Sequence, residues 1–218
     1  MSTEKSVDAG SRGSRDLWLA AAYETLIESG VDAVRIQPLA RKVDLSRTSF
    51  YWFFADREAL LEALLGLWRD KNTGNLIIRA AAYAESITEA VFNVFDCWLD
   101  PAIFDSQFEF AVRSWGLQSP EVSAEIRRAD DARLAALAEM FRRFGFDAVA
   151  ADVRARTMYF VQIGYISINA REDLAVRMER VPHYVEIYTG ATVLPRDLAR
   201  FQARHRFVPQ ARVGTRAA

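Results

Sequence analysis

Residues 46–60 constrain the fold of this chain more than any other stretch. Aromatic side chains occupy every position from 50 to 54. Ser46 precedes them and Asp56 follows them, and both residue types cap helices by accepting hydrogen bonds from backbone N–H groups. We therefore expect a short helix after Ser46, a tight turn, and a new helix from Asp56. A short surface helix rich in aromatic, arginine and hydroxyl side chains suits insertion into a DNA groove.

The two faces of this short helix differ in character. Phe50, Phe53 and Phe54 share one side, and we expect them to pack on the preceding helix. The other side or its rim then carries Arg47, Thr48, Ser49, Tyr51 and Trp52. A buried helix would not leave an arginine and two hydroxyls without partners. Periodicity alone leaves an alternative open, a short connector whose aromatic side chains all lie in the core.

Two further helices are predicted before this stretch. Apolar residues recur at helical spacing over 15–29, with Ser14 as the N-cap and Gly30 as the stop. A second helix covers 36–43, with Pro38 in its first turn, where a missing N–H does no harm. Asp44 follows at a sharp turn. Two short helices around such a turn form a helix-turn-helix, whose second helix enters the major groove.

The remaining sequence is also predicted to be helical. Proline at helix starts, glycine at helix ends and the absence of a strand pattern or repeat make the chain all-α. We expect a three-helix helix-turn-helix DNA-binding domain followed by a helical bundle. The predicted helices cover 56–82 (weak at 72–75), 85–99, 101–117, 120–144, 148–171, 174–190 and 195–206. The predicted domains are a disordered tail (1–13), the DNA-binding domain (14–62), the helical bundle (63–206) and a flexible tail (207–218).

Composition excludes several classes of protein. No run of about 18 apolar residues is present and the first residues are polar, so we expect no membrane span and a cytoplasmic location. Cys97 is the single cysteine, which rules out an internal disulfide. The net charge is −1, yet residues 35–57 hold five cations against two anions. Such a cluster can be a nucleic-acid contact or a solvated face.

Residues 15–65 resemble the N-terminal DNA-binding domain of TetR-family transcriptional regulators. The resemblance rests on Ala21-Ala22, Gly30, Leu39-Ala40, the segment 46–51, Phe54 and the segment 56–60. The sequence departs from the family pattern at three places. Asp44 replaces the usual turn glycine, Phe53 replaces a polar residue of the recognition helix, and Arg35 replaces a hydroxyl residue at the start of the second helix.

The resemblance implies a set of DNA contacts. Tyr51 and Arg57 would bind phosphates, with Arg35 and Gln37 as weaker candidates. Arg47, Thr48, Ser49 and Trp52 would read bases. One such module specifies too few base pairs, so a homodimer on a palindromic operator is expected. The dimer should form through helices 148–171 and 174–190, with the candidate interface residues Tyr159, Ile163, Gly164, Ile166, Ala170 and Tyr184.

The resemblance also implies that the helical bundle 63–206 is a ligand-binding and dimerisation domain. A small-molecule effector would bind there and release the protein from DNA, and repression is the usual effect in the family. Candidate pocket residues are Trp68, Asn93, Trp98, Phe108, Arg113, Trp115, Phe141 and Tyr159. Large aromatic residues at helical spacing more often form the core than a pocket. The composition favours an apolar or aromatic ligand, with or without a carboxylate that Arg113 would bind.

The alternatives to a DNA-binding regulator are an enzyme and a helical module without DNA binding. An enzyme is not expected, because His183 and His205 lack neighbouring ligand or nucleophile patterns and no phosphate-loop, dinucleotide or hydrolase motif is present. Asp130 and Asp131 are sequence neighbours, which diverge by about 100° on a helix. No cofactor or metal is expected. A helical small-molecule sensor or interaction module without DNA binding stays open because of Arg35 and Phe53.

Overall fold

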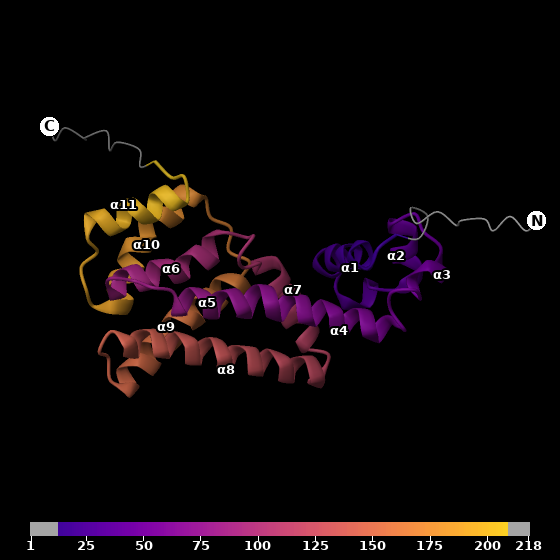
Figure 1. Ribbon diagram of the computed structural model, residues 1–218, viewed down its shortest axis with the longest axis horizontal. Coiled ribbons are helices and arrows are strands. Elements are labelled where there is room, and N and C mark those ends of the chain that lie inside the picture. The colour runs from indigo at the N-terminus through magenta and orange to yellow at the C-terminus, as the bar shows by residue number, and fades with distance from the viewer. Residues whose placement is uncertain (1–12, 209–218) are drawn as a thin grey trace, which may run out of the picture. The chain divides into compact units, whose positions relative to one another are not determined.

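The computed structural model describes residues 13–208, so the predicted tails lie almost wholly outside the described residues. Helices alone form the regular structure of this range, and the all-α prediction is confirmed (Figure 1). No helix in it combines the length and apolar character needed to cross a lipid bilayer. The α-helices are α1 (Arg15–Ser29), α2 (Ile36–Lys42), α3 (Arg47–Phe50), α4 (Arg57–Trp68), α5 (Asn75–Ala81), α6 (Ile87–Leu99), α7 (Ser106–Gly116), α8 (Pro120–Arg143), α9 (Ala148–Ser167), α10 (Leu174–Thr189) and α11 (Pro195–Arg204).

The described chain divides into two compact units that do not follow the predicted boundary at 62/63. The first unit joins the residues up to Gly74 with 105–130, and the second joins 75–104 with 131–208. Helix α7 and the first half of α8 therefore belong with the three N-terminal helices. Apolar side chains of α7, among them Phe108 and Val112, share one core with α1 and α4. A three-helix domain of this size buries little apolar surface alone, and α7 enlarges its core.

Helix α1 matches its predicted bounds and its predicted inward face. Its N-cap Ser14 accepts a hydrogen bond from the Leu17 amide at 3.1 Å, and it ends at Gly30, whose φ of 78° favours glycine. Trp18 lies on the buried face of α1 and meets the Phe50 ring edge-on, with centroids 5.3 Å apart. This contact fixes α3 against α1.

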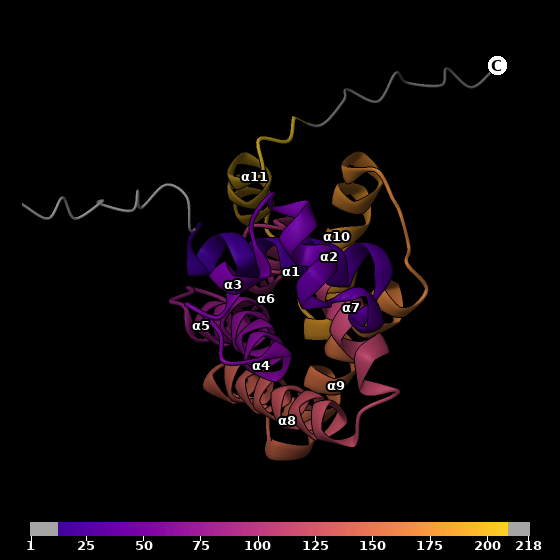
Figure 2. The same cartoon turned by 90° about the vertical axis from the view of Figure 1, so that its right-hand side faces the viewer.

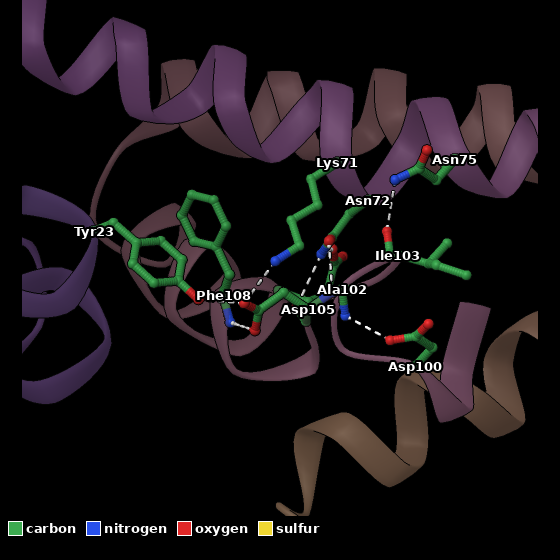
Figure 3. Close-up of polar contacts among 10 residues, drawn as sticks. Tyr23, Lys71, Asn72, Asn75, Asp100, Ala102, Ile103, Asp105 and Phe108 are labelled. Carbon is green, nitrogen blue, oxygen red and sulfur yellow. Dashed lines mark hydrogen bonds and ion pairs between the residues drawn. The ribbon is translucent and has the colours of Figure 1, made fainter. Parts of the chain in front are cut away.

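The predicted weak spot after α4 is a π-helical segment, η3 (Arg69–Gly74), that joins α4 to α5. Its Asn72 is fully buried. The Asn72 amide donates to the Asp105 carbonyl at 3.0 Å and to the Glu109 carboxylate at 2.9 Å, and its oxygen accepts from the Asp105 amide at 2.8 Å. The wide π-helical turn therefore coincides with an inward-facing asparagine, whose side chain forms hydrogen bonds with polar groups at the start of α7 (Figure 3).

Two predicted helix boundaries are wrong. Helix α7 begins at Ser106 rather than at Pro101, because the Asp100 carboxylate closes a turn on the Ala102 amide at 2.9 Å and Asp105 supplies the cap. Helix α9 ends at Ser167 rather than near residue 171, and Asn169 adopts a φ of 49° just beyond it. The sequence also predicts a kink or a break at Pro182, but α10 continues through Pro182 and ends at Gly190, which adopts the left-handed conformation.

The second unit is built around α6. Its residues from Ala90 to Trp98 are buried on every side. Helices α5, α10 and α11 contact it, and α9 contacts α10. In the end-on view of Figure 2, α5 and α11 are seen on one side of this unit and α10 on the other. The core of this unit also takes in Phe141 and Phe146, which meet edge-on at 5.5 Å. A helix that is buried all round needs such a complete shell of neighbours.

Candidate DNA interface and ligand cavity

The turn between α2 and α3 has the geometry that a helix-turn-helix requires. Asp44 adopts a φ of 53°, which confirms that it takes the turn position without glycine. The Leu45 amide then donates to the Ala40 carbonyl at 2.9 Å, and the Ser46 hydroxyl caps α3 by accepting from the Ser49 amide at 3.3 Å. Helix α3 is one turn long and continues as turns to Phe54. Asp56 caps α4 by accepting from the Ala59 amide at 2.7 Å, also as predicted.

Helix α3 and the turn after it present a cation, a hydroxyl and two aromatic rings to solvent. Arg47 and Thr48 are exposed, Tyr51 is 50% exposed and Trp52 is 66% exposed. Phe50 and Phe54 are buried beneath them, as the division into faces predicts, whereas Phe53 is half-buried. Within residues 13–208 no hydrogen bond or ion pair engages the Arg47 guanidinium. This exposed set is chemically able to contact base edges.

Ser49 is a correction to the predicted base-reading set. Its side chain is buried, and its hydroxyl donates to the Ser46 carbonyl at 2.7 Å. An inward hydroxyl that is already bonded to its own helix does not reach a DNA base. The prediction assigned every residue outside the Phe50, Phe53 and Phe54 set to the outer side or its rim. Position 49 lies four residues before Phe53, however, and residues four apart share one side of a helix.

Arg57 also serves a purpose that the sequence did not reveal. It is half-buried at the start of α4, and its Nε and Nη2 atoms donate to the carbonyls of Val34 and Val31 at 2.6 and 2.8 Å. The guanidinium thereby ties α4 to the connection between α1 and α2. Arg57 therefore positions α4 through two of its nitrogens. Its third nitrogen lies 3.8 Å from the carboxylate of exposed Glu58, and the predicted phosphate contact of Arg57 stays a prediction.

The other cations of this region divide into paired and unpaired groups. Lys42 is held by Glu24 at 3.1 Å and Glu28 at 3.3 Å, both on α1. Arg35 is exposed and donates through Nε to the Asp32 carbonyl at 2.8 Å, and Gln37 is exposed beside it. Arg41 is exposed without an ion pair in the described part of the chain, so it joins the candidates for phosphate contact. The local excess of positive charge was its signal in the sequence.

The predicted ligand residues are divided between the two units. Trp68, Phe108, Arg113 and Trp115 belong to the first unit, and Asn93, Trp98, Phe141 and Tyr159 belong to the second. Phe108 and Phe141 are fully buried core residues. Trp115 is also buried in the core of the first unit, and the Tyr159 hydroxyl accepts from buried Arg133 at 2.9 Å.

The two predicted polar handles are occupied by other side chains. Arg113 binds Glu109 at 2.9 Å and Asp130 at 3.1 Å, and the Trp68 indole donates to the same Glu109 at 2.7 Å. Asn93 donates to the Tyr83 carbonyl at 3.2 Å. Arg113 and Asn93 therefore satisfy the fold, and neither offers a ligand a free group.

Asp105 joins the first helix to the start of α7. One of its oxygens caps α7 by accepting from the Phe108 amide at 2.9 Å. The other accepts from the Tyr23 hydroxyl of α1 and lies 3.4 Å from the Lys71 ammonium (Figure 3). Burial, followed by the Asp105 hydrogen bond, raises the pKa of Tyr23, which keeps the phenol protonated as the donor.

A cavity of about 370 Å³, counting the part open to solvent, lies within the second unit. Trp98 is the predicted ligand residue that reaches it. Its lining comes from α6, α9, α10 and the α9–α10 connection: Phe95, Trp98, Met158, Val161, Gln162, Tyr165, Glu172, Arg177, Arg180, Val181, Tyr184 and Tyr188. Sequence reasoning missed most of these residues because they come from three separate helices.

Residues 19–64 match the family of bacterial regulatory proteins called the tetR family. A comparison with curated proteins finds no match. Among solved structures, Salmonella enterica GusR superposes with a TM-score of 0.61 at 17% identity, covering 86% of this chain and 98% of its own.

A second solved structure, Mycobacterium smegmatis AmtR, gives a TM-score of 0.60 at 16% identity, covering 96% of this chain and all of its own. At such identities these structures establish the shared fold. The family match spans α1, α2, α3 and most of α4, the helices that carry the exposed Arg47 surface. Residues 19–64 therefore belong to the tetR family of bacterial regulatory proteins, and this match supports a DNA-binding transcriptional regulator.

Proposed function

We propose that this protein is a ligand-responsive repressor that binds a palindromic operator as a homodimer and leaves it when a small molecule binds. The observation that carries this proposal is the exposed set on α3 and the turn after it: Arg47, Thr48, Tyr51 and Trp52 stand outward over a buried Phe50. Large aromatic side chains exposed on a one-turn helix lose apolar burial, and a DNA groove restores it. As a regulator of transcription the protein would act in the cytoplasm, where bacterial DNA lies.

Each exposed residue has a chemical role in this proposal. Arg47 can donate two hydrogen bonds to the O6 and N7 atoms of guanine, and Thr48 or the Trp52 edge can contact a thymine methyl. The Tyr51 hydroxyl donates to a phosphate, as do Arg35, Gln37 and Arg41 from α2. Base contacts set sequence preference, whereas phosphate contacts contribute affinity that is equal for every sequence.

The homodimer is supported by an apolar stripe on α9, although not by all of the predicted residues. Tyr159 and Ile166 are buried within their own protomer and are removed from the predicted set. Ile163 and Tyr184 are half-buried, and Gly164 and Ala170 are exposed. The exposed apolar residues of α9 and its C-cap recur at helical spacing: Val149, Val153, Phe160 and Ile168. The exposed Ile187 of α10 belongs to the same surface.

A second copy of this chain would cover that stripe. Val149, Val153 and Ile187 line an open groove between α9 and α10. Nothing lies within 4 Å of a Cβ placed on Gly164, so a partner helix has room to approach there. Two-fold pairing brings the same residues of both copies together, and it presents two α3 helices to two half-sites.

The test is operator binding by fluorescence anisotropy, on a DNA sequence selected from a random library by the full chain. Binding should weaken steeply as salt rises, because phosphate contacts release counterions. Arg47→Ala should cost about 1–3 kcal/mol on the selected site and relax preference at one position. Tyr51→Ala should weaken binding to all sequences alike. Arg127→Ala, an exposed arginine of α8, is the matched control and should bind as the parent does.

Two results would contradict the proposal. If a folded dimer selects no sequence and shows no salt-sensitive binding, the chain is a helical sensor or interaction module without DNA binding. If Arg47→Ala and Tyr51→Ala change affinity for every operator variant equally, the division into base and phosphate contacts is wrong.

A further inference from the structure

The cavity of the second unit has aromatic walls. Phe95 and Trp98 of α6 meet edge-on with centroids 5.1 Å apart, and Tyr188 of α10 stacks on Phe95 at 6.5 Å. Tyr184 continues this wall by stacking on Tyr188 at 5.8 Å. All four residues line the cavity. Flat rings on two helices favour a flat, apolar ligand group between them.

Two donors on the cavity lining are not satisfied by the protein. The Trp98 side chain is buried, and its indole Nε1 has no hydrogen-bond partner among the described residues. Arg177 is half-buried, and residues 13–208 offer its guanidinium no hydrogen bond and no ion pair within 4 Å. A buried donor without a partner costs free energy, which a bound acceptor recovers.

The charge of the lining favours an anion. The lining holds one carboxylate, that of Glu172, and two guanidinium groups, those of Arg177 and Arg180. Glu172 forms an ion pair with Arg180, so the charge of Arg177 is in excess. Burial lowers the pKa of the Arg177 guanidinium, with Glu172 and Tyr165 opposing that shift. An arginine stays charged at neutral pH despite such a shift. The cavity therefore holds a partly desolvated positive charge that a bound anion would neutralise.

The other polar groups of the lining include three phenols and an amide. The hydroxyls of Tyr165 and Tyr184 lie 3.0 Å apart and share a hydrogen bond. This bond, with burial, raises the pKa of Tyr184, and burial raises the pKa of Tyr188. These phenols can orient a ligand by hydrogen bonding without adding charge, and so can the buried amide of Gln162.

We propose that the effector of this protein is an aromatic monoanion, bound in the cavity between α6, α9 and α10. Its carboxylate pairs with Arg177, and its ring lies against Phe95, Trp98 and Tyr188. The inference rests on the proposed function for the existence of an effector, and it adds the ligand's chemical class and its counter-ion. Arg113, the handle predicted from sequence, is replaced by Arg177.

The test uses 2-naphthoate as the probe, with its neutral analogue 2-naphthylmethanol and its cationic analogue 2-naphthylmethylamine. Isothermal titration of the full chain should show 2-naphthoate binding most tightly. Arg177→Gln should weaken naphthoate binding about 10- to 100-fold, the range for a hydrogen-bonded charged group. It should leave the affinity for the alcohol nearly unchanged. Trp98→Phe keeps the ring and removes the donor, and should weaken naphthoate about 3- to 10-fold if the indole N–H reaches the ligand.

The matched control for Arg177→Gln is the same substitution at an arginine outside the cavity. Arg171→Gln removes an exposed arginine of the α9–α10 connection that does not line the cavity, and it should bind naphthoate as the parent does. The inference is overturned if the amine or the alcohol binds as tightly as naphthoate, or if Arg177→Gln and Arg171→Gln behave alike. Operator binding without ligand, measured on the same variants, separates this from the proposed function. Normal DNA binding with no naphthoate binding overturns the ligand class alone, whereas loss of DNA binding in the parent chain overturns the regulator.

Discussion

At the scale of single residues, adjacent hydroxyls of α3 have different functions. Thr48 is exposed, whereas Ser49 is buried and donates to the Ser46 carbonyl. Thr48→Ala should change the preference for one base position without loss of stability. Ser49→Ala should lower the free energy of unfolding by about 1 kcal/mol and leave base preference unchanged. Urea unfolding and anisotropy on operator variants measure the two effects. A change of base preference in Ser49→Ala would show that the hydroxyl does reach DNA.

Cys97 should be inert in the folded protein. Burial, as the largest cause, raises the pKa of its thiol from 9.0 to about 12. The reactive thiolate is therefore absent near neutral pH. Ellman's reagent at pH 8 should react with Cys97 only after unfolding in urea. Rapid reaction of the native protein would mean that α6 opens to solvent.

The same shift has a consequence for stability. The unfolded thiol ionises near pH 9 while the folded thiol stays protonated. Cys97 therefore contributes no pH dependence below about pH 8, and it reduces the stability of the fold as pH rises from 9 towards 12. Cys97→Ser removes that titration, so the slope of stability against pH should become smaller in this range.

Sequence patterns identified which face of a helix is buried more reliably than the partner of each polar group. Phe50 and Phe54 follow from helical periodicity, because apolar burial depends on spacing alone. Arg57 does not, because its partners are the carbonyls of Val31 and Val34, and any residue supplies a carbonyl. Arg177 has no local signal either, since the cavity that it lines comes from helices distant in sequence.

At the scale of elements, capping residues predicted most helix starts correctly. The prediction failed for α7, where Asp100 and Asp105 are both candidate N-caps. Ser14, Ser46, Asp56 and Asp147 each accept from an amide three residues on. Asp100 has the same chemistry followed by proline, yet it closes an isolated turn. Asp105 begins α7, because long-range partners on α1 and η3 satisfy its remaining atoms. A sequence shows both candidate caps but not those partners.

Asp105 should therefore contribute more to stability than an ordinary cap. It accepts from the Phe108 amide, the Tyr23 hydroxyl and the Lys71 ammonium, whereas Asp147 caps α9 on the exposed surface. Asp147→Ala should cost about 1 kcal/mol, the usual value of an N-cap. Asp105→Ala should cost about 2–4 kcal/mol, because it also leaves buried donors unpaired. Urea denaturation of both variants measures the difference, and equal losses would show that Asp105 acts only as a cap.

At the scale of the whole molecule, the two compact units interleave along the chain. The sequence predicted consecutive domains, since a resemblance confined to residues 15–65 marks where the DNA-binding helices end. In the structure, residues 105–130 belong to the first unit, because the apolar face of α7 packs in one core with α1 and α4. Contacts between segments so distant in sequence leave no periodic pattern, and a single sequence does not reveal them.

The assembly predicted for this chain depends on the apolar stripe of α9. Phe160 lies on it and is 53% exposed in the single chain. In a two-fold dimer, Phe160→Asp would place a charge in an apolar interface in both copies, and burying an unpaired charge is costly. The variant should sediment as a monomer at concentrations where the parent is a dimer, and its operator affinity should fall by at least about 100-fold because one half-site alone is read.

Ile78→Asp is the control for this dimer test. Ile78 is an apolar residue of α5 that is 65% exposed and lies outside the stripe. It should remain dimeric and bind the operator as the parent does. Circular dichroism checks that both variants fold. A folded Phe160→Asp that stays dimeric would place the interface on another face, and the exposed residues of α5 would then be the next surface to test.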